Sequence, residues 1–158
     1  MGAINNAFNQ AAGAAAGAAL AIKHAKETEE SKMYTAENAA LVARNQARAA
    51  EAEANAANDE AVGKGGLVEQ MTAAEANREK AQKAFDKAIN RKNGSTKTKL
   101  KKRNDLIAAQ EAELALNNKY KAIIDMNNRA EEQRAHADKA TQLAEKAQQK
   151  YQSRWGGK

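Results

Sequence analysis

Two residue types are absent from this 158-residue chain, which contains neither Pro nor Cys. Without Cys it cannot form disulfides or use thiol chemistry. Without Pro, no position forces a helix to break or kink. Aromatic residues are also scarce, at 4% of the chain. These absences exclude a disulfide-stabilised domain and are compatible with long, uninterrupted helices.

Large apolar side chains are scarce as well. The hydrophobic fraction is 42%, but alanine, the residue with the highest helix propensity, supplies most of it and makes up about a quarter of the chain. A buried alanine removes little apolar surface from water, so the chain cannot build a thick core. Composition therefore predicts an all-α fold of elongated, Ala-rich helices in a hairpin or coiled-coil-like arrangement, which forms a multi-chain helical assembly.

Two interruptions of the helical pattern, here called the weak points, divide the chain. The first is a glycine cluster, Gly63, Gly65 and Gly66, which suits a helix end followed by a hinge or turn. The second is Asn-Gly-Ser-Thr at residues 93–96. The predicted segments are an uncharged Ala/Gly-rich helix at 1–26, an Ala-rich acidic helix at 27–62, a heptad helix at 67–92, a basic turn at 93–104 and a long C-terminal helix at 105–155. Short turns predict antiparallel neighbours.

Apolar spacing predicts which faces pack. In residues 67–92, spacings of three and four connect Met71, Ala74, Arg78, Ala81, Phe85 and Ala88. As an alternative, a capping box formed by Thr72 and Glu75 would start this helix later than Leu67. In the C-terminal helix the predicted face contains Leu106, Ala109, Ala112, Leu116, Tyr120, Ile123, Ala130, Ala137, Ala144 and Tyr151.

The first 22 residues carry no charged side chain. Helical spacing gathers Ile4, Phe8, Ala11, Ala15, Ala18 and Ile22 on one face, and Gly13 and Gly17 form a GxxxG spacing that permits close helix approach. The clean apolar run, residues 11–22, is short against the about 20 residues that span a bilayer. Two interpretations stay open for Ile4, Phe8, Gly13, Gly17, Leu20 and Ile22: close helix packing inside an assembly, or conditional membrane contact.

Positive charge is concentrated near the second weak point. Residues 91–103 contain no acid, although the whole chain has a net charge of only +6, so the remainder is close to neutral. Such a cluster predicts binding to phosphates of DNA or anionic lipid, or to an acidic protein partner. No aromatic residue lies among the cations, so stacking on bases is not indicated. The predicted binding residues are Arg91, Lys92, Lys97, Lys99, Lys101, Lys102 and Arg103.

The sequence contains no complete catalytic or metal-binding pattern. The sequence Val-Gly-Lys-Gly at 62–65 lacks both the upstream Gly and the Ser or Thr of a phosphate-binding loop. The two histidines, His24 and His136, have no metal-ligand spacing around them. We therefore expect no enzymatic activity, no catalytic residues, no metal and no cofactor.

An uncharged Ala/Gly-rich N-terminus at residues 11–22 is combined here with a long Pro-free helix at 101–151 rich in Ala, Gln, Lys and Glu. In this composition and order of segments, and not in any diagnostic motif, the chain resembles the small internal virion proteins of short-tailed bacteriophages. The resemblance implies a protein packaged in or near the portal and ejected with the genome, where it helps to form a DNA conduit across the host envelope.

The leading functional prediction is accordingly a structural bacteriophage virion protein, internal or associated with portal or tail, that forms a homo-oligomer. Its expected partners are copies of itself, portal or tail proteins, and the DNA backbone. Its expected location is the virion, assembled in the host cytoplasm, with the host envelope as its location after ejection. The alternatives are a membrane-active helical protein and a non-specific DNA-binding or compaction protein.

Overall fold

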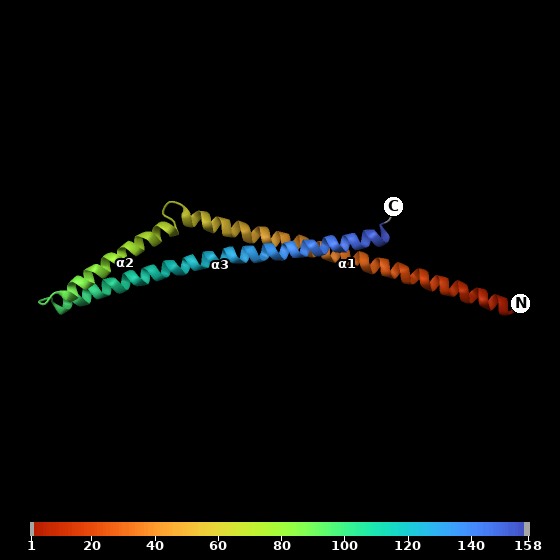
Figure 1. Cartoon of the computed structure of the whole chain (residues 1–158), viewed down its shortest axis with the longest axis horizontal. Helices are drawn as coiled ribbons and strands as arrows, with labels where there is room; N and C mark the ends of the chain where they lie inside the picture. The colour runs from red at the N-terminus through yellow and green to blue at the C-terminus, as the bar shows by residue number, and fades with distance from the viewer. Residues whose placement is uncertain (1, 157–158) are drawn as a thin grey trace. The chain divides into compact units, whose positions relative to one another are not determined.

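The computed structural model describes residues 2–156, with burial and side-chain positions for residues 4–7 and 9–156. Three α-helices account for nearly all of this part: α1 (Gly2–Val62), α2 (Leu67–Asn90) and α3 (Thr96–Trp155) (Figure 1). No strand occurs among the described residues. The prediction of an all-α fold with long helices is confirmed.

The helix boundaries differ from the predicted segments in three places, the smallest difference being that α2 ends at Asn90 and not at residue 92. From Gly2 onward, the predicted segments 1–26 and 27–62 form one helix, because nothing near residue 26 interrupts the helical pattern. Helix α3 begins at Thr96, so most of the segment expected to be a basic turn is its first turns instead. The side chain of Ser95 explains this early start, since its Oγ accepts a hydrogen bond from the Thr98 N–H at 3.3 Å.

The chain divides into two compact units, each formed by segments from different helices. Unit 1 combines α1 up to Arg48 with α3 from Gln133 onward, and unit 2 contains residues 49–132. Each unit is described by itself below.

Unit 1 is held together by methyl groups. In α1, Met33, Ala40, Ala43 and Ala47 are buried and follow spacings of three, four and seven. They face α3, where Ala137 packs with Ala43 and Ala47 in one cluster. Small side chains let the two helix axes approach closely, so a narrow seam replaces a thick core.

Unit 2 contains the end of α1, the whole of α2 and the first part of α3. Asn58 of α1 and Asn127 of α3 exchange two side-chain hydrogen bonds, each 2.9 Å long. Further along, the Nε of Arg78 in α2 donates to Glu113 of α3 at 2.5 Å. As the chain advances through α1 and α2, its partners in α3 run backward, so both segments lie antiparallel to α3.

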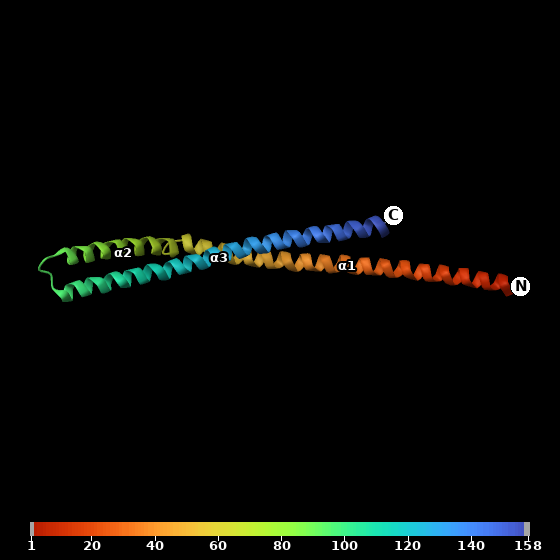
Figure 2. The ribbon, with the colours of Figure 1, turned by 60° about the horizontal axis from the view of Figure 1, so that its bottom comes forward.

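The glycine cluster therefore does not reverse the chain. Within unit 2, the last turns of α1 and then α2 run in the same general direction, opposite to that of α3, in both ribbon views (Figure 1, Figure 2). The prediction of antiparallel neighbours is confirmed for α2 and α3 and wrong for α1 and α2. The physical reason is that the alanine-rich faces of both helices are covered by α3, which leaves neither face for the other helix.

The predicted face of α2 is confirmed, because all six of its residues are buried or half-buried. Helix α2 nevertheless begins at Leu67, and Thr72 donates to the carbonyl of Val68 at 3.0 Å within the helix. The alternative start at a Thr72 capping box is therefore wrong.

The predicted face of α3 needs two corrections. Ala112 is exposed while the neighbouring Glu113 is half-buried, because Arg78 of α2 draws the carboxylate into the interface. Tyr120, expected on the packed face, is 44% exposed. Leu106, Ala137 and Ala144 are buried as predicted.

Candidate functional site

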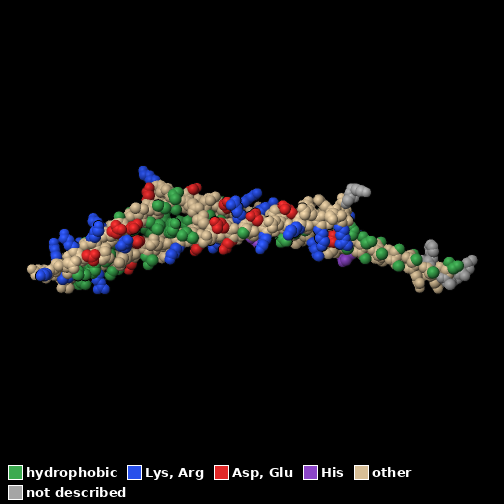
Figure 3. Space-filling model, in the orientation of Figure 1, with side chains coloured by type: hydrophobic (Ala, Val, Ile, Leu, Met, Phe, Trp, Pro, Cys, Tyr) green, Lys and Arg blue, Asp and Glu red, His purple; other side chains and the backbone are tan. Residues whose placement is uncertain are grey.

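The N-terminal part of α1 has no cover within the described part of the chain. Residues 4–7 and 9–24 are all exposed, and the large side chains reach 73% exposure at Ile4, 67% at Leu20 and 57% at Ile22. A Cβ added to Gly13 or Gly17 would meet no atom within 4 Å. The side chain of Phe8 lies outside the described residues. On the face drawn in Figure 3, the start of α1 shows no acidic or basic side chain.

This uncovered stretch continues the packed face of α1. The inward positions of α1 in unit 1 are spaced by three and four from Glu29 through Met33 to Ala47. Counting backward in the same phase gives Ile22, Ala18, Ala15, Ala11, residue 8 and Ile4. The apolar face predicted for residues 4–22 is thus the continuation of the seam that α3 covers further on.

Helix α3 ends where this uncovered stretch begins. The indole Nε1 of Trp155 donates to Glu29 at 2.6 Å, and Arg154 donates to the other carboxylate oxygen at 2.5 Å. The Arg154 guanidinium also lies over the Trp155 ring, 5.0 Å from its centre. The indole hydrogen bond, followed by the Arg154 hydrogen bond and charge, lowers the pKa of Glu29 below its ordinary value. This cluster, which sequence reasoning missed, fixes the end of α3 against α1.

The second candidate region is a depression where α2 turns into α3, here called the basic corner. It has a volume of about 700 Å³, and it is lined by Ala84, Lys87, Ala88, Arg91, Lys92, Asn93, Gly94, Ser95, Thr98, Lys99 and Lys102. Five of these residues are Lys or Arg, and none is acidic. Ala84 and Ala88 are its only apolar side chains.

The structure divides the seven predicted cations into two groups. Arg91, Lys92, Lys99 and Lys102 line the basic corner, whereas Lys97, Lys101 and Arg103 do not. The physical reason is that residues 96–103 are helical, so that successive side chains are distributed around the axis of α3 and do not all reach the depression.

Lys87 belongs to the basic corner although it precedes the cation-rich stretch. It lies four residues before Arg91, the residue that directly follows the end of α2, and both side chains line the depression. Helical spacing could have revealed it, but a search for a contiguous run of charge does not. Asn93, Ser95 and Thr98 add neutral hydrogen-bonding groups to the lining.

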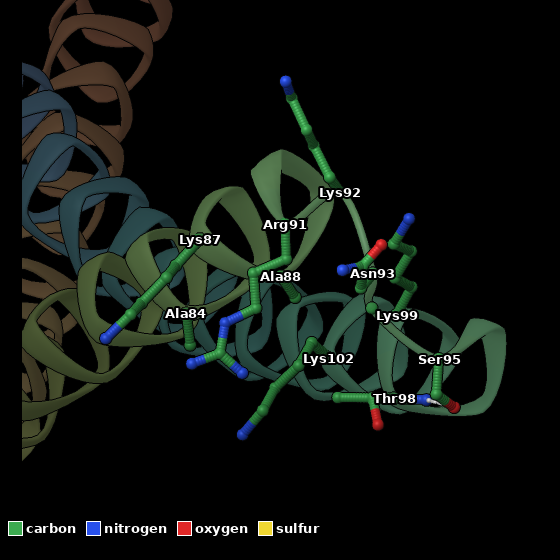
Figure 4. Close-up of a pocket in the computed structure, with 11 residues that line it drawn as sticks. Ala84, Lys87, Ala88, Arg91, Lys92, Asn93, Ser95, Thr98, Lys99 and Lys102 are labelled. Carbon is green, nitrogen blue, oxygen red and sulfur yellow. Dashed lines mark hydrogen bonds between the residues drawn. The ribbon is translucent and has the colours of Figure 1, made fainter.

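The close-up shows how these side chains are directed. Lys87, Arg91 and Lys102 extend toward one side of the helix pair, although they come from two helices and the turn (Figure 4). Lys92 extends to the opposite side. Lys99 lies against the turn, and its Cε is 3.3 Å from where a Cβ on Gly94 would stand. None of the five cations forms an ion pair with another described residue.

The glycines predicted as a hinge form the connection between α1 and α2. Gly65 has a φ of 71°, a left-handed conformation that favours glycine. A Cβ on Gly66 would clash with the carbonyl oxygen of Glu60. The N–H of Gly65 donates to Glu69 at 2.8 Å, and the Gly63 N–H donates to the Asp59 carbonyl at 3.0 Å. These contacts hold the connection in one conformation, and hinge motion at Gly63, Gly65 and Gly66 stays a prediction.

The histidines and the other side chains that could bind a metal do not form a site within the described residues. His24 is exposed on α1, and His136 on α3 lines a small groove beside Leu143. Within the described residues, no three His, Cys, Asp or Glu side chains are grouped so that they could hold a metal ion. In the same part of the chain, no helix combines the length and apolar character that crossing a bilayer requires.

Comparison with known proteins gives no relative. No protein-family model, curated protein or solved structure matches the chain. Its function is therefore inferred from its own geometry.

Proposed function

We propose that this chain is a structural protein that acts by assembling with further copies of itself, and that residues 4–22 of α1 form the contact between copies. One observation carries the proposal: the seam of α1 continues in phase beyond the end of α3, where the described residues provide nothing to cover it. Most helical stability in proteins comes from packing of an amphipathic face, and the exposed face of residues 4–22 has no such packing within the described residues. Another helix would supply that packing.

The chemistry of the stretch favours a second copy as the occupant. It has no charged side chain before Lys23, so it offers no ion pair to select a charged partner. Its face combines Ile4 and Ile22 with alanines, and small side chains permit close approach to a similar face. The corresponding stretch of another molecule has the same uncharged, small-residue character. Coiled-coil-like packing between copies would extend the seam that already joins α1 to α3.

The proposal includes a biological setting, a bacteriophage virion. The support is the resemblance in style to small internal virion proteins, in which uncharged Ala/Gly-rich ends precede long Pro-free helices. In this setting the assembly would lie beside portal or tail proteins, leave with the genome and act without catalysis. Genes for portal and tail proteins next to the gene for this chain are the expected observation, and a neighbourhood of unrelated metabolic genes would contradict this setting.

Sedimentation velocity tests the assembly directly. The full chain is expected to sediment as an oligomer, and a variant lacking residues 2–22 as a monomer. Gly13→Leu with Gly17→Leu should also weaken association, because two bulky side chains would separate closely packed helices. Ala135→Leu with Leu114→Ala, changes at exposed positions of α3, is the matched control. A full chain that stays monomeric at high concentration would refute the proposal.

A membrane-active protein is the second candidate, favoured by the same exposed apolar side chains. Residues 4–22 would then lie at a lipid surface as an amphipathic helix. Liposome leakage that requires residues 2–22, from a chain that is monomeric without lipid, would favour this function over assembly.

A further inference from the structure

The basic corner gathers cations that have no counter-charge. Lys87 and Arg91 at the end of α2 and Lys102 in the second turn of α3 extend toward the same side (Figure 4). Unpaired side chains of this kind repel one another, and an anion in their midst would offset that repulsion. The nearest acid along α3, Asp105, lines a neighbouring groove with Lys80 and Lys102 and marks the boundary of the cationic surface.

The lining contains the donor types that proteins use for phosphate. Arginine can donate two parallel hydrogen bonds to one phosphate, and lysine contributes a point charge. Ser95, Thr98 and Asn93 lie between the cations, and neutral side chains of these types commonly contact phosphate oxygens. The first turn of α3 adds N–H groups and the positive end of the helix dipole.

We propose that the basic corner, with Lys87, Arg91 and Lys102 as its main contacts, binds the phosphate backbone of nucleic acid without regard to sequence. Cations on two sides of the corner can follow consecutive phosphates, because Lys92 and Lys99 extend the surface around the turn. The lining has no aromatic side chain for stacking and no ring of donors shaped for a base edge. This inference is independent of the assembly proposed above.

A lipid surface is the competing ligand, and the position of the apolar residues argues against it. Membrane-surface segments place large apolar side chains beside their cations. Here the depression is lined by alanine alone among apolar residues, whereas Ile89 and Leu100, both about half exposed, lie outside its lining. Ile89→Ser with Leu100→Ser should therefore leave ligand binding at the basic corner unchanged.

Fluorescence anisotropy with a short mixed-sequence DNA duplex tests the proposal on the full chain. With three phosphate contacts, raising salt from about 50 to about 200 mM should weaken binding by roughly 40-fold. Lys87→Gln, Arg91→Gln and Lys102→Gln combined should remove most of this salt dependence and weaken binding at least about tenfold at low salt. A second duplex of unrelated sequence should bind equally well.

The matched control removes the same charge from the same stretch of chain. Lys97→Gln, Lys101→Gln and Arg103→Gln lie outside the depression and should weaken binding by only a few-fold. Equal losses from the two triple variants would overturn the proposal, because bulk charge would then explain binding. So would no measurable DNA binding by the unmodified chain, or binding only to anionic phosphatidylserine vesicles. Circular dichroism is expected to show that both variants keep their helices.

Discussion

At the scale of single residues, the contacts between helices are mostly methyl groups, and polar contacts occur at a few defined points. Asn58 and Asn127 satisfy one another across the interface, and Asn127 also donates to the Ile123 carbonyl at 2.9 Å. Two alanine-rich helix faces can pack in many registers, because their small side chains repeat along both helices. A reciprocal amide pair is satisfied at only one alignment, so it can select the register of α1 on α3.

A double-mutant cycle measures the amide pair. Asn58→Ala and Asn127→Ala should each lower the free energy of unfolding by about 1 kcal/mol, because the remaining half-buried amide loses its partner. The double variant should lose less than the sum of the two. Urea unfolding monitored by circular dichroism provides the values, and strictly additive losses would show that the two amides do not stabilise one another.

The Glu29 cluster predicts a pH response in unit 1. The pKa of Glu29 is lowered in the folded chain, chiefly by the Trp155 indole hydrogen bond and then by Arg154. A lowered pKa means that the cluster stabilises the fold above the ordinary glutamate pKa and loses this effect as pH falls through the lowered value. The end of α3 should therefore loosen from α1 only in acid.

Trp155 is the single tryptophan of the chain and reports this transition by fluorescence. Its emission should shift to the red with a midpoint below the ordinary glutamate range. Glu29→Gln should abolish the step, and Glu30→Gln, one position along α1, should preserve it. An unchanged step in Glu29→Gln would assign the transition to another group.

At the scale of the helices, the seam of α1 and α3 leaves no room for larger side chains. Ala43 is 2% exposed and packs with Ala47 and Ala137. Leucine at such a position must push the helices apart or adopt a strained rotamer.

Ala43→Leu should accordingly destabilise the chain by about 1–3 kcal/mol. Ala135→Leu, at an exposed position of α3, should change the free energy of unfolding by less than about 0.5 kcal/mol. Thermal or urea unfolding compares the two. If Ala43→Leu were as stable as the original chain, the close approach of α1 and α3 would be wrong.

Sequence periodicity identified helices and their packed faces well, because alanine propensity and spacings of three and four are local properties. It failed where contacts between helices decide the outcome. Glu113 is drawn into the interface by Arg78, which lies 35 residues earlier in the chain, and Lys87 joins cations beyond the turn. The sequence also did not predict that α2 continues in the same direction as the end of α1. Glycines indicate where a helix ends, but not in which direction the chain continues.

At the scale of the whole molecule, the central claim is that the uncharged start of α1 is covered by another copy. Within the described residues, every described side chain of α1 up to His24 is exposed, whereas buried positions recur further on, along the face that α3 covers. A lone exposed helix exchanges its amide hydrogens quickly, because it opens at little cost in free energy. The same helix packed in an assembly exchanges slowly.

Hydrogen exchange measured by mass spectrometry over a range of protein concentrations therefore tests the claim most directly. Peptides covering residues 4–22 are expected to exchange rapidly in dilute solution and to become protected as concentration rises, while peptides from the interface of α1 with α3 stay protected throughout. Rapid exchange of residues 4–22 at every concentration, with no change on self-association, would contradict the account.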